Sequence, residues 1–401
     1  MASGPSTAAA ALELSRAKPE RLYALDGLRG AAAVVVLLFH ATLHTAMPAT
    51  LGPLLAVGPL GPLVNGPGAV HVFFVLSGYV LALTLDGDDR PGWLARYYVR
   101  RLFRIQPPYM AAVLLAWTVT RLVIPPGFHD PNAPWARVPA AVLPVALAFP
   151  SRGFGLVPVG WSLFVEMAMS LLFPLLFLLA RRSHSAVPVA LSLLFLREFE
   201  PSWRFLRFMI DFAIGLALRL EAPRISALMR RLPRFAPALL GGAGLVLLQL
   251  PYLAGLMATG YAGLEYGHSP AAVAQFALGA GLLLVAALHA RLQRALSSRL
   301  GRFLGRISYS FYLVHAGVRH AREELSASLA DGDRDHRAHL CAHRGAGRTR
   351  LAPRRSPRHP RRAMGDPHLA HRAGSRPMRS AGSAAHRQPG RGRLYCVRCG
   401  C

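Results

Sequence analysis

An arginine and a histidine lie eleven residues apart in an apolar stretch near the beginning of the chain. Eleven residues make about three turns of α-helix, so Arg29 and His40 share one helix face at a separation of roughly 16 Å. Ionisable side chains inside apolar helices are costly to bury and usually serve a function. Near neutral pH an imidazole acts as a general base or as a nucleophile. His40 is therefore a candidate reacting residue; the alternative is a hydrogen-bonded packing histidine, with Arg29 at the membrane edge.

Two further pairs have helical spacing. Arg101 and Arg104 lie three residues apart on a face that suits contacts with phosphate oxygens, although loop charge alone would also place them beside a membrane. Ser162 and Glu166 lie four residues apart on a helix that we expect to begin at Trp161. A carboxylate about a turn and a half inside a membrane helix is paired, protonated or functional. A structural ion pair with an intramembrane cation is the alternative to orienting a substrate.

Polar and small residues interrupt the apolar run 69–85 at Ser77, Gly78 and Tyr79. Such residues let helices approach closely and form hydrogen bonds across their interface. Helix packing alone therefore explains this interruption at least as well as contact with a substrate.

Two more ionisable residues fall in apolar runs. Asp211 follows Arg207 by four residues, and this spacing predicts a local ion pair on one helix face. His315 lies near the end of the last apolar run. Both are buried candidates without an assigned role.

The composition indicates a membrane protein. Of 401 residues, 53% are apolar and 16% are charged, whereas soluble domains carry about 25% charged residues. A helix of about 20 apolar residues spans a bilayer. The spanning candidates are 24–47, 69–85, 106–124, 161–179, 203–220, 236–257 and 271–290. Shorter apolar runs lie at 139–149, at 186–196 and from Ile307 onward.

Arginine clusters predict the orientation, because basic residues are enriched in cytoplasmic loops. If 186–196 crosses the membrane and 139–149 does not, the clusters at 90–104, 181–182, 224–234 and 291–306 all fall on the side of the N-terminus. We therefore predict an all-α, polytopic transmembrane helical bundle of about nine or ten membrane helices with a cytoplasmic N-terminus. Residues 1–22 are expected to form a cytoplasmic tail and residues 23–318 the membrane domain.

Residues 319–401 differ sharply from the membrane domain, since they hold 19 arginines and 6 acidic residues and lack long apolar runs. One interpretation is a disordered basic tail that binds polyanions. A zinc site at Cys396, Cys399 and Cys401 is a weaker one, because a single CxxC is a poor signal. We favour a third, the product of a shifted reading frame in a GC-rich gene. We therefore expect no metal and no nucleic-acid partner, and we expect the chain to be unstable without its final helix.

Several segments resemble the acyltransferase family 3 of integral-membrane proteins. The resemblance begins with YALDGLRG at 23–30 running into LFH at 38–40, which contains the family hallmark of Arg, ten residues and His. It continues in order along the chain to about residue 316. The further segments are FFVLSGY at 73–79, RLFR at 101–104 followed by Pro108 and Tyr109, WSLFVE at 161–166 and ISYSFYLVH at 307–315.

The resemblance implies transfer of an acyl group, with acetyl as the default, from cytoplasmic acyl-coenzyme A to a hydroxyl of a cell-surface glycan or glycolipid. The protein would lie in the cell membrane as a multi-pass protein, and acyl-coenzyme A would be a co-substrate rather than a bound cofactor. His40 would act as general base or transient acyl carrier. The catalytic group is His40, Arg29 and Glu166, and the donor-binding pair is Arg101 and Arg104. Substrate-binding or structural support is assigned to His71, Ser77, Tyr79, Trp161 and Ser162.

One position departs from the family pattern. His71 occurs where the family commonly has an acidic residue that pairs with the catalytic histidine, so the partner that orients His40 is left open. Two other functions also stay open. A polytopic transporter would place ionisable residues in the membrane as well, but the chain lacks the internal repeats that many transporters have. An inactive, truncated family member would account for the abrupt change at residue 319.

Overall fold

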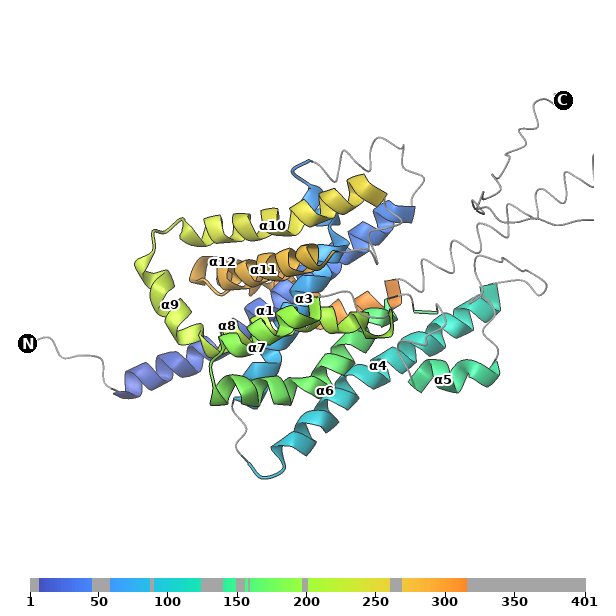
Figure 1. Ribbon diagram of the computed structural model, residues 1–401, viewed down its shortest axis with the longest axis horizontal. Helices are drawn as coiled ribbons and strands as arrows, with labels where there is room; N and C mark the ends of the chain where they lie inside the picture. Colours follow the sequence, from blue (N-terminus) through green and yellow to red (C-terminus); the bar gives the residue numbers. More distant parts are fainter. Residues whose placement is uncertain are drawn as a thin grey trace, which may run out of the picture. The chain divides into compact units, whose positions relative to one another are not determined.

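The apolar runs fold into helices in the computed structural model, which describes residues 7–44, 58–86, 90–123, 140–148, 156–157, 159–196, 201–259 and 269–315. All regular structure in these ranges is helical (Figure 1). A helix satisfies its backbone hydrogen bonds within one segment, which is what a bilayer requires. The described residues belong to one compact unit, and the predicted all-α polytopic bundle is confirmed.

The described chain consists of α-helices and short 3₁₀ segments. The α-helices are α1 (Thr7–His44), α3 (Gly66–Leu85), α4 (Trp93–Val123), α5 (Leu143–Ala148), α6 (Gly160–Arg182), α7 (Ala186–Leu193), α8 (Met209–Leu220), α9 (Ala222–Arg231), α10 (Ala236–Thr259), α11 (Pro270–Ala287) and α12 (Ala290–Leu296). The 3₁₀ segments are η1 (Gly61–Val64), η3 (Ala140–Val142), η5 (Leu194–Leu196) and η6 (Pro201–Phe208). Residues 299–315 are also helical, and we call them the last described helix.

Helix α3 lies in the middle of the bundle and packs against α1, α8 and α11. Its start is fixed by Asn65, whose side chain accepts a hydrogen bond from the backbone N–H of Gly68 at 2.8 Å, as expected of an N-cap residue. Two glycines bring α3 and α8 close together. A Cβ atom on Gly78 would meet the backbone of Phe212, and one on Gly215 would meet the backbone of Val75. The predicted close approach at Gly78 is therefore present.

A second close approach joins α1 to the last described helix. A Cβ atom on Gly30 would lie 2.7 Å from the backbone nitrogen of Gly305, and a Cβ atom on Gly305 would contact the backbone of Asp26. This contact places the first and last described helices side by side, so residues as far apart in the sequence as Asp26 and Gly305 can build one site.

Ion pairs join the C-terminal ends of α3, α6 and α8. Asp86, which follows α3, pairs with Arg219 at 2.8 Å and with Arg181 at 3.8 Å. Just beyond, α9 links the end of α8 to α10 (Figure 1). The Glu221 carboxylate accepts hydrogen bonds from Ser185 and Arg224, both at 2.7 Å. These bonds, that from Ser185 first, hold the pKa of Glu221 below its ordinary value.

Five helices of the described residues are long and apolar enough to cross a membrane. They are Tyr23–Thr42, Gly66–Leu85, Gly160–Arg182, Ala236–Ala254 and Pro270–Ala287. Each of these overlaps a predicted span, so the chain is a multi-pass membrane protein. Two other predicted spans, 106–124 and 203–220, do not appear among them, and the total of nine or ten remains a prediction.

The predicted span 203–220 is helical throughout, but its helical repeat changes along the segment. Its first part, Pro201–Phe208, is a 3₁₀ segment, and α8 proper has 12 residues. The twelve α-helical residues rise about 18 Å and the 3₁₀ residues 203–208 rise about 12 Å, which together approach a bilayer core of about 30 Å; the crossing at 203–220 remains a prediction. The span predicted at 106–124 is part of the longer α4, which begins at Trp93 and includes Pro107 and Pro108.

The first and last described helices can be compared with the predicted domain limits. Helix α1 begins at Thr7, so part of the predicted tail 1–22 continues the first membrane helix. The run from Ile307 onward is helical as far as His315. The predicted segment 319–401 lies outside the described residues.

Candidate active site

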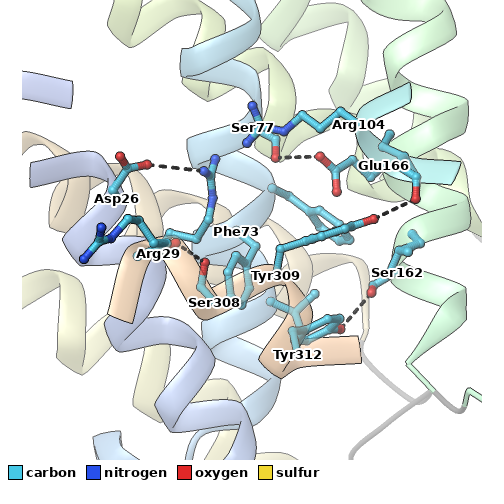
Figure 2. A pocket seen from close by; sticks show the side chains of 16 residues that line it. Asp26, Arg29, Phe73, Ser77, Arg104, Ser162, Glu166, Ser308, Tyr309 and Tyr312 are labelled. Carbon is cyan, nitrogen blue, oxygen red and sulfur yellow. Dashed lines mark hydrogen bonds and ion pairs between the residues drawn. The ribbon is translucent and has the colours of Figure 1, made fainter. Parts of the chain in front are cut away.

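A cavity of about 230 Å³ lies between α1, α3, α4, α6 and the last described helix. Three arginines line it, Arg29 from α1, Arg104 from α4 and Arg306 from the last described helix, and we call it the arginine cavity. Arg29 and Arg104 approach from opposite sides in the view of Figure 2. Arg29 is paired with Asp26 at 3.6 Å, whereas Arg104 and Arg306 are exposed. The wall can therefore present several positive charges to an anionic ligand.

Arg101 and Arg104 lie on the same helix but have different surroundings. Arg104 lines the arginine cavity, whereas Arg101 pairs with Glu166 at 3.0 Å. Arg101 also donates from Nε and Nη2 to Ser170 Oγ at 3.1 and 3.0 Å. Ser77 donates to Glu166 Oε1 at 3.4 Å. The intramembrane cation that Glu166 meets is therefore Arg101, and Arg101 is held by the protein itself.

A hydroxyl pair closes one side of the arginine cavity (Figure 2). Ser162 Oγ lies 2.8 Å from the Val159 carbonyl oxygen and 2.7 Å from the Tyr312 hydroxyl. A carbonyl only accepts, so Ser162 donates to Val159, and the Tyr312 hydroxyl donates to Ser162. Beside them, Tyr309 donates its hydroxyl to the carbonyl of Ile105 at 3.0 Å.

A second, smaller cavity of about 40 Å³ contains His40 and His71, and we call it the histidine cavity. Its wall is largely apolar and aromatic, and Trp161 contributes to it. A space of this size holds a few atoms, such as one short acyl group or one hydroxyl group with a water.

The two cavities lie in series along the bundle. On α1 the arginine cavity is lined by Asp26 and Arg29, and the histidine cavity by Val36, Phe39 and His40. On α3 the order is reversed, as expected for an antiparallel neighbour: Gly66, Pro67 and His71 line the histidine cavity, and Phe73, Phe74 and Ser77 line the arginine cavity. Val70 and Tyr312 line both cavities, so these two side chains form the junction.

The tautomer of the His40 imidazole follows from its hydrogen bonds. Its Nδ1 lies 2.9 Å from the Val36 carbonyl oxygen, which can only accept, so Nδ1 carries the proton. The lone pair of the neutral ring is then on Nε2, as a base or nucleophile requires. His315 Nδ1 likewise lies 3.3 Å from the Phe311 carbonyl oxygen. His315 Nε2 is therefore an acceptor, and it lies 3.3 Å from His40 Nδ1.

These contacts answer the question that the sequence left open about His40. The groups that hold its Nδ1–H are a backbone carbonyl and His315, not position 71. His71 has a different partner, since its Nδ1 lies 2.8 Å from Asp211 Oδ1. The ion pair predicted between Asp211 and Arg207 is wrong. Arg207 lies in the 3₁₀ segment η6, where three residues make a turn and positions four apart do not share a face.

The remaining predicted residues fall around the same region. Trp161 packs against Phe208, with ring centroids 5.8 Å apart. Tyr79 is buried, with 1% of its surface exposed, and it lines neither cavity. Arg306 and Tyr312 also line the arginine cavity, although the sequence did not predict them as site residues. The pattern at 305, 308, 309 and 312 repeats with helical spacing and carries three hydroxyl groups, which is a usable signal for a lining face.

The described ranges contain no cluster of three or more His, Cys, Asp or Glu side chains able to hold a metal ion. The polar groups around the two cavities are instead arginines, histidines, hydroxyls and single carboxylates. Such a set can bind an anion at one end and move a proton or accept a group at the other. A helical membrane protein with this arrangement is suited to group transfer.

Comparison with known proteins defines the class. The family model of acyltransferase family 3, described as an acyltransferase domain, matches residues 22–324, and the chain belongs to this family. A similar protein is "Acyltransferase MdmB" of Streptomyces mycarofaciens, which is 32% identical over 165 residues. That match covers 40% of this chain and 41% of the other protein, so less than half of either is compared. No solved structure matches the chain.

Proposed function

We propose that the protein transfers an acyl group, with acetyl as the expected group, from cytoplasmic acyl-coenzyme A to a hydroxyl of a cell-surface glycan or glycolipid in the cell membrane. The observation that carries this proposal is the pair of cavities in series, with arginines in one, His40 in the other and a junction at Val70 and Tyr312. The positive-inside rule directs the arginine cavity towards the cytoplasm. The histidine cavity then lies on the side of the acceptor.

Coenzyme A would enter by its acyl end. At about 230 Å³ the arginine cavity is smaller than the usual site for a drug-sized ligand, so it would take the arm of the donor rather than the nucleotide. Arg104 and Arg306 are exposed at its wall and suit the diphosphate group. Arg29 and His40 are separated by roughly 16 Å along α1, which an extended pantetheine arm is long enough to bridge.

His40 would meet the thioester at the end of this arm. With its proton on Nδ1, its Nε2 can remove a proton from the acceptor hydroxyl or attack the thioester carbonyl directly. The Arg101–Glu166 pair would hold α6 in place against α4, and Glu166 itself lines the arginine cavity. A small apolar space at His40 favours a short acyl group and excludes water from the reaction.

The test is an acyl-transfer assay on the full chain in membrane vesicles. Radiolabelled acetyl-coenzyme A is supplied as donor, and a glycan and glycolipid extract from the source cells as acceptor. We expect labelled ester that is sensitive to mild alkali, and a loss of at least about 1,000-fold in His40→Ala. His184→Ala is the matched control, because His184 is exposed and lines neither cavity.

The binding step has its own control. Arg104→Ala should raise the KM for acetyl-coenzyme A about tenfold, whereas Arg100→Ala, which removes an exposed arginine outside both cavities, should not. Retained transfer in His40→Ala would remove His40 from the reaction. Accumulation of unmodified solute in the vesicles, with no ester formed, would favour a transporter instead.

A further inference from the structure

The pair formed by His71 and Asp211 lies at the crossing of α3 and α8. His71 Nδ1 is 2.8 Å from Asp211 Oδ1, and the exposed fractions of the two residues are 1% and 0%. The His71 ring is stacked on Phe276, with ring centroids 4.8 Å apart and planes 14° apart. Phe208, the last residue of η6, packs on it with ring centroids 5.5 Å apart. The ring is therefore held in one orientation.

Packing alone is a poor explanation for this pair. Asp211 Oδ2 is buried and has no hydrogen-bond partner among the described residues. Burying a carboxylate with one oxygen unsatisfied costs free energy that an apolar pair of similar size would not cost. Buried groups left unsatisfied in this way call for an explanation, and a catalytic role is one of the few available.

The hydrogen bond also sets the proton on His71. With Asp211 ionised, as the proposal requires, its carboxylate only accepts, so Nδ1 of His71 carries the proton that it donates to Asp211. In the neutral ring the lone pair is then on Nε2. His71 lines the histidine cavity together with His40, so two imidazoles in the same tautomer face one small space.

We propose that His71, oriented by Asp211, is the base that takes the proton of the acceptor hydroxyl, and that His40 is the residue that carries the acyl group. This division of roles rests on the proposed acyl transfer. His40 lies on α1, whose other end would bind the donor. His71 lies about one and a half turns from the N-terminal end of α3, which the predicted topology directs towards the acceptor. Two histidines separate the two halves of the reaction.

The proposed acyl transfer has two steps. His40 Nε2 attacks the thioester carbonyl, a C–N bond forms, the C–S bond breaks, and its electron pair leaves on the coenzyme A thiolate. The acceptor oxygen then attacks the acyl carbon while its proton goes to His71 Nε2, and the C–N electron pair returns to His40. His71 gives up the proton to solvent, and the thiolate takes one from solvent. The products are an ester and coenzyme A.

The two halves can be measured separately on the full chain in membranes. Exchange of labelled coenzyme A into acetyl-coenzyme A, without acceptor, needs only the first half. Transfer of the acetyl group to the acceptor extract needs both. In His71→Gln, whose amide can still donate to Asp211, we expect exchange within about threefold of the unaltered protein and transfer reduced by about 100-fold or more. His40→Ala should lose both activities.

A second variant separates chemistry from folding. In His71→Gly, added imidazole should restore part of the transfer, which a purely structural role of the ring would not allow. Asp211→Asn tests the positioning residue. It should lower the kcat of transfer by about 100-fold without changing the KM for acetyl-coenzyme A, because the amide no longer fixes the tautomer of His71.

Three results would overturn the proposal. Transfer at the normal rate in His71→Gln would exclude His71 as the base. Equal loss of exchange and transfer in that variant, without imidazole rescue, would assign the pair to the structure of the site. Transfer without any exchange in the unaltered protein would exclude His40 as the acyl carrier. Failure of the proposed function looks different, since the unaltered protein would then form no ester with any acceptor.

Discussion

The two cavities differ in size, charge and construction. The arginine cavity is about 230 Å³ and is lined by Arg29, Arg104 and Arg306, two of which are exposed. The histidine cavity is about 40 Å³, and its ionisable side chains, His40 and His71, are almost fully buried. One is suited to attracting a charged molecule from water. The other excludes water around a small reacting group.

This difference indicates where selectivity and chemistry reside. Charges in contact with solvent are screened and exchange partners easily, so each exposed arginine contributes modestly to the affinity for the donor. Buried imidazoles with fixed tautomers set the rate, because their proton positions are determined by packing and backbone groups. Variants of the two cavities should therefore change KM and kcat, respectively.

Apart from the reacting histidines themselves, the largest effect is expected at the junction. Val70→Phe places a larger side chain where the cavities meet, so transfer should fall by about 100-fold or more because the reacting groups no longer approach. Donor binding, measured by retention of labelled acetyl-coenzyme A, should persist. Val80→Phe on the same helix lines neither cavity and shares only the overpacking cost. Equal loss in both variants would argue against a passage at Val70.

The next effect concerns stability. Glu166→Ala leaves Arg101 partly buried without its carboxylate; the two side chains are 22% and 11% exposed. The loss should be about 2 kcal/mol, below the value for fully buried pairs, and should appear as a lower melting temperature in detergent. Glu166→Ala combined with Arg101→Met should recover part of it. A double variant as unstable as the sum of the singles would mean that the pair is not coupled.

A smaller effect is expected at the mouth of the arginine cavity. Arg306→Ala should raise the KM for acetyl-coenzyme A about tenfold, equivalent to about 1.4 kcal/mol, with little change in kcat. The unaltered protein should lose affinity for the donor as salt is raised, and the variant should lose less. Arg299→Ala, in the same arginine cluster but outside the cavity, is the control. A fall in kcat alone would place Arg306 near the reacting atoms.

The smallest effect is expected from a single hydroxyl. Tyr312→Phe removes the hydrogen bond that the tyrosine donates to Ser162 at 2.7 Å, which is worth about 1 kcal/mol. Transfer should fall a few-fold, because Tyr312 borders both cavities. Tyr98→Phe removes a comparable bond to the Leu171 carbonyl at 3.0 Å, away from both. If both variants reduced transfer equally, the junction would have no special role for this hydroxyl.

The sequence predicted the helices and the faces they present, because apolar runs and arginine clusters are local signals. Helical spacing together with the family resemblance assigned Arg29 and Arg104 to chemistry, and both line the larger cavity. Spacing along one helix does not reveal which helices pack together. The contact between His40 and His315 joins residues 275 positions apart, and that between His71 and Asp211 joins residues 140 apart.

The error in the predicted partner of Asp211 has a physical cause. The sequence shows a continuous apolar run over 203–220, and the helical repeat of that run pairs Asp211 with Arg207. The chain instead changes from a 3₁₀ to an α-helical repeat after Phe208. That change shortens α8, and a change of helical repeat alters which residues share a face. Glycine contacts at Gly78 and Gly215 then bring Asp211 to α3.

The last described helix supplies Arg306, Tyr309 and Tyr312 to the cavity walls and His315 to His40. A chain synthesised from its N-terminus therefore has its candidate reacting histidine in place early, but both cavities stay open on one side until residues 299–315 have been made. During synthesis the walls of both cavities would be completed only after the helices that precede residue 299, so activity would require residues 299–315 to insert against α1.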